Sequence, residues 1–221
     1  MKLLISGVSL VALMGLASPA FSKDLYVTVF GGASLPSDLT FDGVGIDQHY
    51  TLGLNTGYVA GGAIGMDVTD AVRAEIELSH AVWKSADSVT SVDSFGIANT
   101  SAASGNVNAT YLLANAWMDF DTGSILTPYL GGGVGLGWLS GDTIFGGGGN
   151  GFGTSTGAGF AFQVGTGVKV DLSENMALDV GYRFKDIVNA SAHDLGGAGQ
   201  PEFNNVSVSS HNLQIGLTVK F

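Results

Sequence analysis

The chain has 221 residues, a formal net charge of −11 and no cysteine; 12% of its residues are charged and 45% are hydrophobic. The acidic balance argues against nucleic acid and anionic lipid headgroups as main partners, because both are bound through clusters of Lys and Arg. The lack of cysteine excludes disulfides, thiolate metal sites and cysteine nucleophiles. A chain this apolar must bury a large core or turn apolar side chains toward lipid.

The first 22 residues have the features of a secretory signal peptide. Lys2 supplies the positive charge, a short apolar stretch follows, and Ala20 and Ser22 are the small residues of a cleavage site. We predict cleavage after Ser22 or Ala20 and a mature chain of residues 23–221. Beyond this segment no run approaches the roughly 18 apolar residues of a membrane helix, so a membrane-embedded mature chain would cross as strands.

Eight segments of the mature chain alternate between apolar and small or polar residues, over a length that suits a membrane-spanning strand. In chain order they are residues 24–34, 56–67, 71–83, 108–120, 127–139, 158–171, 176–186 and 212–221. The third is the clearest, since Val72 and Ile76 share one face while Arg73 and Glu75 share the other. In the fifth, one face is a row of glycines, and glycine inside a strand is common where a sheet curves into a barrel.

The connections between these segments alternate strictly between short and long. The short ones are residues 68–70, 121–126 and 172–175, and the long ones are roughly residues 35–55, 84–107, 140–157 and 187–207. This pattern predicts an all-β fold, an eight-stranded antiparallel up-and-down transmembrane β-barrel with three short periplasmic turns and four long extracellular loops. The alternative is a soluble barrel or sandwich, but the broad apolar face favours contact with hydrocarbon.

The faces opposite the apolar ones carry charges that would point into the barrel. These predicted lumen residues are Arg73, Glu75, Glu77, Asp119, Lys169, Asp179, Arg183 and Lys185. The interior of an eight-stranded barrel is just wide enough for side chains to fill, so such charges must pair or reach trapped water. Two interpretations remain open: a structural network of ion pairs that plugs the lumen, and a narrow pore gated by rearranging pairs.

Several segments resemble the OmpA-like, opacity-protein-like family of small outer-membrane β-barrels, over essentially all of residues 23–221. The resemblance rests on Gly57–Gly65, Ala114–Phe120, Pro128–Gly135 and Leu178–Phe184, and on a terminal strand that ends in Phe221. It implies a location in the bacterial outer membrane, reached by export through the inner membrane with a cleaved signal peptide. It also implies that the terminal strand is read by the barrel-assembly machinery. The residues that match this assembly signal are Leu213, Ile215, Leu217, Val219 and Phe221.

Signals for catalysis or metal binding are weak. None of the four histidines, His49, His80, His193 and His211, has a partner at a metal-ligand spacing. The pairs Ser79-His80 and Ser210-His211 lie near the predicted outer rim, where some outer-membrane barrels carry a hydrolase site, but ordinary rim polarity explains them better. We expect no catalytic residue, no cofactor and no metal.

The sequence thus predicts a non-enzymatic barrel with a structural or surface role in the cell envelope. The alternatives are a narrow porin-like channel for small solutes and a surface adhesin or antigen that acts through its loops. The expected partners are outer-membrane lipids, the barrel-assembly machinery and periplasmic chaperones, with external ligands at the loops as a further possibility and no nucleic acid. Aromatic residues near strand ends, Trp83, Trp138, Tyr182 and Phe221, are predicted to form girdles at the two membrane interfaces.

Overall fold

The structure is a computed structural model that describes residues 25–43, 48–145, 150–152, 158–193 and 202–221. The predicted signal peptide and its cleavage site lie outside these residues. Within the described ranges the secondary structure consists of strands alone. No helix in this part of the chain has the length and hydrophobicity to cross a membrane.

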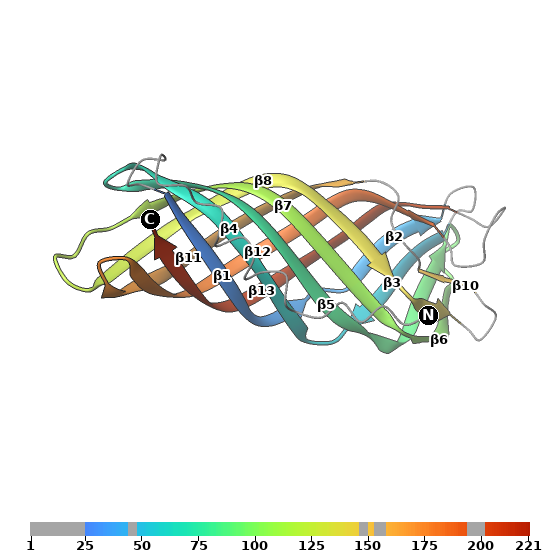
Figure 1. Ribbon diagram of the computed structural model, residues 1–221. Helices are drawn as coiled ribbons and strands as arrows, with labels where there is room; N and C mark the ends of the chain where they lie inside the picture. The colour runs from blue at the N-terminus through green and yellow to red at the C-terminus, as the bar shows by residue number, and fades with distance from the viewer. Residues whose placement is uncertain (1–24, 44–47, 146–149, 153–157, 194–201) are drawn as a thin grey trace, which may run out of the picture.

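Thirteen strands make up a single antiparallel sheet system. They are β1 (Leu25–Pro36), β2 (Leu39–Gly43), β3 (Gln48–Leu54), β4 (Gly57–Thr69), β5 (Val72–Asp93), β6 (Ala98–Ser104), β7 (Asn106–Asp119), β8 (Leu126–Gly141), β9 (Thr143–Phe145), β10 (Asn150–Phe152), β11 (Gly159–Ser173), β12 (Met176–His193) and β13 (Glu202–Lys220). Eight of them close into a ring in the order β1-β4-β5-β7-β8-β11-β12-β13, with β13 pairing back to β1 (Figure 1). The predicted up-and-down, eight-stranded antiparallel barrel is therefore confirmed.

The start of β1 at Leu25, the end of the chain at Phe221 and the three short turns all lie at the same end of the barrel, on the left in Figure 1. Hydrogen bonds tie this end together: the backbone N–H of Phe221 donates to the carbonyl of Leu25 at 3.0 Å, and that of Lys220 donates to Asn175 at 2.9 Å. The turns join β4 to β5, β7 to β8 and β11 to β12. We call this the turn end, and the opposite end the hairpin end.

The hairpin end differs from the sequence prediction, which placed long loops there. In the described residues these connections are mostly strand, because β5, β12 and β13 run on well past their predicted ends and β2, β3, β6, β9 and β10 are added. β2 pairs with β13 and β3 pairs with β5, so these two strands continue the wall above β1 and β4. These added pairings extend the barrel wall because they satisfy further backbone N–H and C=O groups.

The outer face of the ring is apolar and the inner face is not. Outward residues such as Ile64, Ile76, Val134 and Ile215 are about half exposed, as expected for side chains that face hydrocarbon. Toward the hairpin end the interior is filled by a buried apolar cluster. Its large members are Leu39, Phe41, Leu52, Trp83, Tyr111, Leu113, Leu139 and Ile187.

Trp83 corrects one sequence prediction, because it does not belong to an interface girdle. It is fully buried in the interior, where its indole N–H donates to the hydroxyl of Ser34 at 2.9 Å. From Arg73 to Ser85 the odd-numbered residues of β5 face inward, and Trp83 follows that alternation. Its position in the alternation, and not its chemical type, determines its side of the wall.

Candidate functional site in the lumen of the barrel

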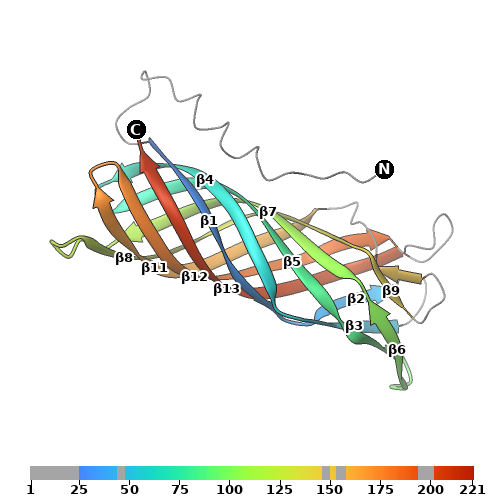
Figure 2. The ribbon, with the colours of Figure 1, turned by 60° about the horizontal axis from the view of Figure 1, so that its bottom comes forward.

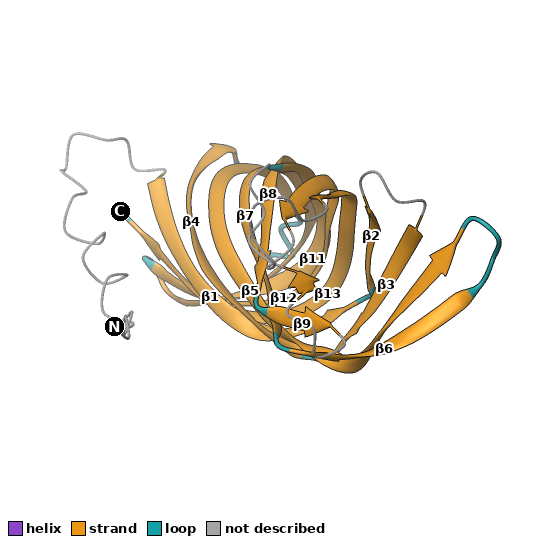
Figure 3. Ribbon diagram, turned by 90° about the vertical axis from the view of Figure 1, so that its right-hand side faces the viewer, coloured by secondary structure: helices purple, strands orange, loops and turns teal. Residues whose placement is uncertain are grey.

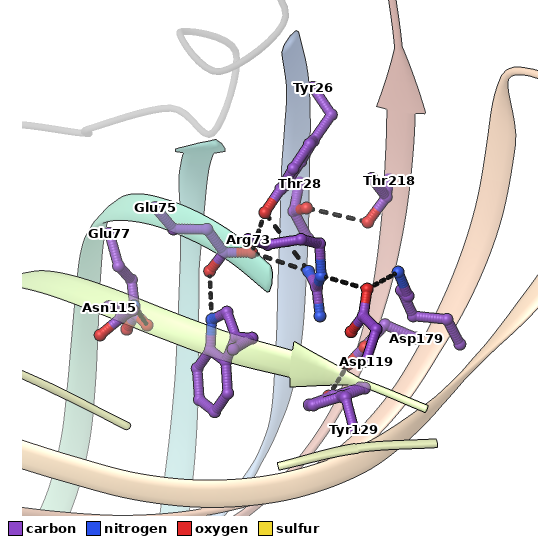
Figure 4. A network of polar contacts seen from close by, with 12 residues as sticks. Tyr26, Thr28, Arg73, Glu75, Glu77, Asn115, Asp119, Tyr129, Asp179 and Thr218 are labelled. Carbon is purple, nitrogen blue, oxygen red and sulfur yellow. Dashed lines mark hydrogen bonds and ion pairs between the residues drawn. The ribbon is translucent and has the colours of Figure 1, made fainter. Parts of the chain in front are cut away.

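The middle of the lumen holds a network of charged side chains, whose part near the turn end is centred on Asp119 (Figure 4). Its carboxylate accepts hydrogen bonds from Arg73 Nε at 2.8 Å and from Lys169 Nζ at 2.6 Å. All three side chains are at most about a tenth exposed. Because β5, β7 and β11 contribute one residue each, these contacts connect separate parts of the ring across its interior.

Glu75 forms the second centre of this part of the network. Its carboxylate accepts hydrogen bonds from the Tyr26 hydroxyl and from the Trp117 indole, both at 2.8 Å. Arg73 Nη1 lies 3.1 Å from the same carboxylate. A buried carboxylate needs this number of donors, since an unpaired charge away from water costs several kcal/mol, on the order of 3–5.

Arg183 is held mainly by aromatic side chains. Its guanidinium lies 4.2 Å from the centre of the Trp117 ring, and its Nη2 donates to the Tyr129 hydroxyl at 2.7 Å. That hydroxyl donates in turn to Asp179 at 2.9 Å, while the direct distance between Arg183 and Asp179 is 4.0 Å. The Tyr129 hydroxyl therefore links the guanidinium of Arg183 to the carboxylate of Asp179.

A second cluster, nearer the hairpin end, is centred on Glu77. Lys185 donates to this carboxylate at 2.5 Å, and further donors are Ser79 at 2.7 Å, Gln163 at 2.7 Å and Asn115 at 3.1 Å. The side chains of Lys185 and Glu77 are 1% and 5% exposed. The pair is therefore almost fully buried, and four side chains of the protein donate to the carboxylate.

All eight of the predicted lumen residues face the interior and take part in one of these two clusters. They comprise four cations and four carboxylates, so their charges cancel. Sequence reasoning did not include the neutral members that complete the network. These are Tyr26, Ser79, Asn115, Trp117, Tyr129 and Gln163. Each occupies an inward position of its strand, so the alternation could have identified them.

The lumen leaves little free space around the network. A cavity of about 20 Å³ lies between the two clusters, next to Thr28, Phe30 and Gln214. A single water needs roughly 10–15 Å³, and the buried amide nitrogen of Gln214 has no protein partner among the described residues. Towards the hairpin end the apolar cluster follows directly. Side chains therefore fill the lumen both at the charged network and at the apolar cluster.

The glycine row of β8 provides space for the network. Gly131, Gly133 and Gly135 face inward beside β7. A methyl group on Gly133 would overlap the side-chain oxygen of Asn115, and one on Gly131 would press on the Trp117 ring. The glycines therefore allow the backbones of β7 and β8 to approach closely and leave room for the side chains of Asn115 and Trp117.

The structure does not bring the two Ser-His pairs together as catalytic dyads. Ser79 and Ser210 are buried on the inner face, whereas the adjacent histidines lie on the outer face of the wall. His80 contacts the Thr110 hydroxyl at 2.9 Å, and His211 contacts the Tyr182 hydroxyl at 2.6 Å. Neighbouring residues of a strand point to opposite sides, so neither serine can be activated by the histidine that follows it.

Of the two remaining histidines, only His49 has a described side chain. His49 contacts Asp42 in the β2–β3 hairpin, and the side chain of His193 lies outside the described part of the structure. Among the residues that are described, no group of three or more His, Asp and Glu side chains could hold a metal ion.

The predicted assembly residues lie on the outer face of β13, the last strand of the ring. Leu213 and Ile215 are 59% exposed, and Phe221 is exposed just beyond the end of the strand. β13 pairs with β1 along eleven consecutive residue pairs, so this strand closes the barrel. The geometry places the alternating apolar residues where the first and last strands meet.

Comparison with known proteins agrees with this architecture. A family model described as an outer membrane protein beta-barrel domain matches residues 8–221. Among solved structures, the chain is similar to the Neisserial surface protein A (TM-score 0.50, 21% identity, covering 89% of this chain and 97% of that one). It is also similar to the outer membrane protein OprG from Pseudomonas aeruginosa (TM-score 0.52, 16% identity, 88% and 95% covered).

At these identities the structural similarity shows the fold alone. No curated protein sequence matches the chain. The family model covers nearly the whole chain, and the ring of eight strands has the architecture that the family description states. The chain therefore belongs to the family of bacterial outer-membrane β-barrel domains.

Proposed function

We propose that this protein is a closed, non-conducting barrel with a structural and surface role in the outer membrane. The observation that supports it is the filled lumen, in which four cations and four carboxylates, all with side chains at most 15% exposed, cancel one another beneath an apolar cluster. An ion that entered would have to separate a pair such as Glu77 and Lys185, which leaves an uncompensated buried charge. The cost of separating such a pair favours a structural ion-pair network that closes the lumen over a narrow porin-like channel.

The same proposal assigns an orientation. The turn end, with its three short connections, faces the periplasm, and four long hairpin connections face the outside of the cell, as is usual for such barrels. Export uses a cleaved signal peptide, and the partners of biogenesis are periplasmic chaperones and the barrel-assembly machinery, which reads Leu213 to Phe221. The mature barrel contacts outer-membrane lipids and acts without catalysis. Contacts with external ligands are made by the hairpins.

Planar-bilayer recording of the refolded mature chain tests the closed lumen. We expect stable insertion without discrete conductance for the wild type. Arg73→Ala and Glu75→Ala serve as network variants, and Lys84→Ala, which changes an exposed cation outside the lumen, is the control. Discrete wild-type channels whose conductance rises in the two network variants, but not in the control, would show a gated pore and contradict the proposal.

A further inference from the structure

The outer wall of the barrel carries an apolar groove of about 850 Å³ across β13, β1, β4 and β5. β13, β1 and β4 lie side by side in Figure 2. The floor of the groove is low because three outward positions, Gly31, Ala60 and Gly62, carry little or no side chain. Gly31 and Ala60 face each other in the pairing of β1 with β4. Larger apolar side chains surround this floor, and they are Val29, Ile64, Ile76, Leu78 and Ile215.

The groove has the depth of a single leaflet. On β4 it extends from Ala60 to Ile64, and on β5 from Ile76 to His80. Four residue steps cover about 13 Å along a strand, or roughly 10 Å across the membrane at the usual tilt of such strands. The hydrocarbon core is about 30 Å thick, so each leaflet contributes about 15 Å. One acyl chain of one leaflet therefore matches the groove in depth.

The end of the groove toward the hairpin end is polar. His80 and Thr110 line it there, and the His80 ring nitrogen lies 2.9 Å from the Thr110 hydroxyl. The end toward the turns is lined by Leu178 and Leu217 and is apolar. A groove with this gradient fits one chain of an amphipathic molecule whose polar part lies at the membrane interface.

Lys84 supplies a positive charge above the polar end. It is exposed on the same face of β5 as His80, four residues farther on. The pairing of β5 with β7 ends at Lys84 and Asn106, and β5 then continues into the hairpin that extends past the rim (Figure 3). The chain has eight Lys and Arg residues, of which four lie in the lumen and Lys220 at the turn end. Among the described residues, Lys84 is thus the only lysine or arginine on the outer face near the hairpin end.

We propose that the groove binds one acyl chain of lipid A, the anionic glycolipid of the outer leaflet. The proposal rests on the orientation proposed above, in which the polar end of the groove lies in that leaflet. The His80–Thr110 pair offers a donor and an acceptor to the oxygen atoms near the head of the chain. Lys84 reaches a phosphate of the headgroup. A single lysine is not the basic cluster that binds an anionic surface, so van der Waals packing of the chain supplies most of the affinity.

The concave shape argues against a second copy of this chain as the occupant. A two-fold interface places the same patch on both partners. Two hollows that face each other leave a void, and the atoms around a void lose their packing contacts. A flexible chain of methylene groups can instead follow the floor over Gly31, Ala60 and Gly62.

Three variants test the proposal. Ala60→Phe fills the groove from its floor. Ala114→Phe places the same ring on the outward face of β7, outside the groove, and is the matched control. Lys84→Gln removes the charge and keeps a polar side chain. Circular dichroism and resistance to urea, compared with the wild type, show that each variant is folded.

Native mass spectrometry of the refolded mature chain in mild detergent measures binding of lipid A and, as a second probe, of phosphatidylethanolamine, which has no net charge. We expect one lipid A per wild-type barrel, unchanged affinity in Ala114→Phe and at least about tenfold weaker binding in Ala60→Phe. The wild type should prefer lipid A to phosphatidylethanolamine severalfold, and Lys84→Gln should lose this preference because the ion pair with the phosphate is gone.

Equal binding of lipid A to Ala60→Phe and Ala114→Phe would overturn the inference, as would a preference for lipid A that Lys84→Gln retains. A concentration-dependent dimer that only Ala60→Phe abolishes would assign the groove to a second copy. These measurements in micelles depend neither on the orientation in the cell nor on the lumen, which the conductance recordings test. Failure of lipid binding is thus distinguishable from failure of the proposed function.

Discussion

Lys185 and Glu77 show how the lumen stabilises charges away from water. The ammonium group lies 2.5 Å from the carboxylate and 2.8 Å from the Ser79 hydroxyl. The Tyr111 and Phe30 rings lie within 6 Å of the same ammonium group. Such a pair adds little net stability compared with apolar residues of the same shape, but removal of one partner leaves the other charge buried and uncompensated.

Lys185→Met should therefore lower the free energy of unfolding by about 3–5 kcal/mol. Urea unfolding in detergent micelles, followed by tryptophan fluorescence, measures this change because Trp117 lies in the same lumen. Lys84→Met, an exposed lysine on β5, is the control and should change stability by at most about 0.5 kcal/mol. The double variant Glu77→Gln/Lys185→Met should recover part of the loss. Equal stabilities of the single variant and the control would refute a structural role of the pair.

The second prediction at the level of single residues concerns the glycine row. Gly133→Ala should destabilise the barrel by about 1–3 kcal/mol, because the methyl group would overlap Asn115 and displace a donor to Glu77. Gly31→Ala is the matched control, since its methyl group would point outward and meet only the Val59 carbonyl at 3.5 Å. The two variants can be compared in the same unfolding assay. A larger loss for Gly31→Ala would contradict the packing argument.

At the level of strands, sequence alternation predicted the turn end closely and the hairpin end poorly. β5 begins at Val72, one residue from its predicted start, but it ends at Asp93 and not near residue 83. Alternation arises where one face meets hydrocarbon and the other meets the lumen. Beyond the membrane both faces of β6 are small and polar, so no periodic signal marks that strand.

The same reasoning explains what could be predicted of the lumen. The facing of each charged residue follows from its position in its own strand, and this was available from the sequence. The partners were not, because Glu77 and Lys185 are 108 residues apart and meet only through the register of several strand pairs. Register depends on the closure of the whole ring, which local patterns do not determine.

The last strand gives a prediction about assembly. Phe221 is exposed beyond β13, and its contact with Leu25 is made by the backbone, which alanine preserves. Phe221→Ala should therefore leave spontaneous refolding into lipid vesicles near the wild-type level but lower the yield of folded barrel in cells severalfold. Phe160→Ala, another exposed outward aromatic residue, controls for the loss of lipid contact. Equal yields of the two variants in cells would count against Phe221 as an assembly signal.

At the level of the whole molecule, the charges that do not cancel lie at its two ends. The lumen contributes equal numbers of cations and carboxylates, and Lys220 pairs with Asp67 near the turn end. Exposed carboxylates then remain on either side of the apolar belt. At the turn end these are Asp70, Asp121, Asp171 and Glu174, and at the hairpin end they include Asp38, Asp87 and Asp142. Charged ends resist entry into hydrocarbon, so they keep the belt at the depth of the bilayer.

The proposed orientation can be tested directly because the chain contains no cysteine. Ser94→Cys places a thiol at the exposed tip of the β5–β6 hairpin, and Ser173→Cys places one at the exposed turn end. In intact cells a membrane-impermeant maleimide should label the first variant and not the second, whereas lysed cells should show equal labelling. In a barrel with an even number of strands, the first and last strands begin and end on the same side of the membrane. Labelling of Ser173→Cys alone in intact cells would therefore show that the barrel has the opposite orientation. It would place the β5–β6 hairpin in the periplasm and the three short turns at the cell surface.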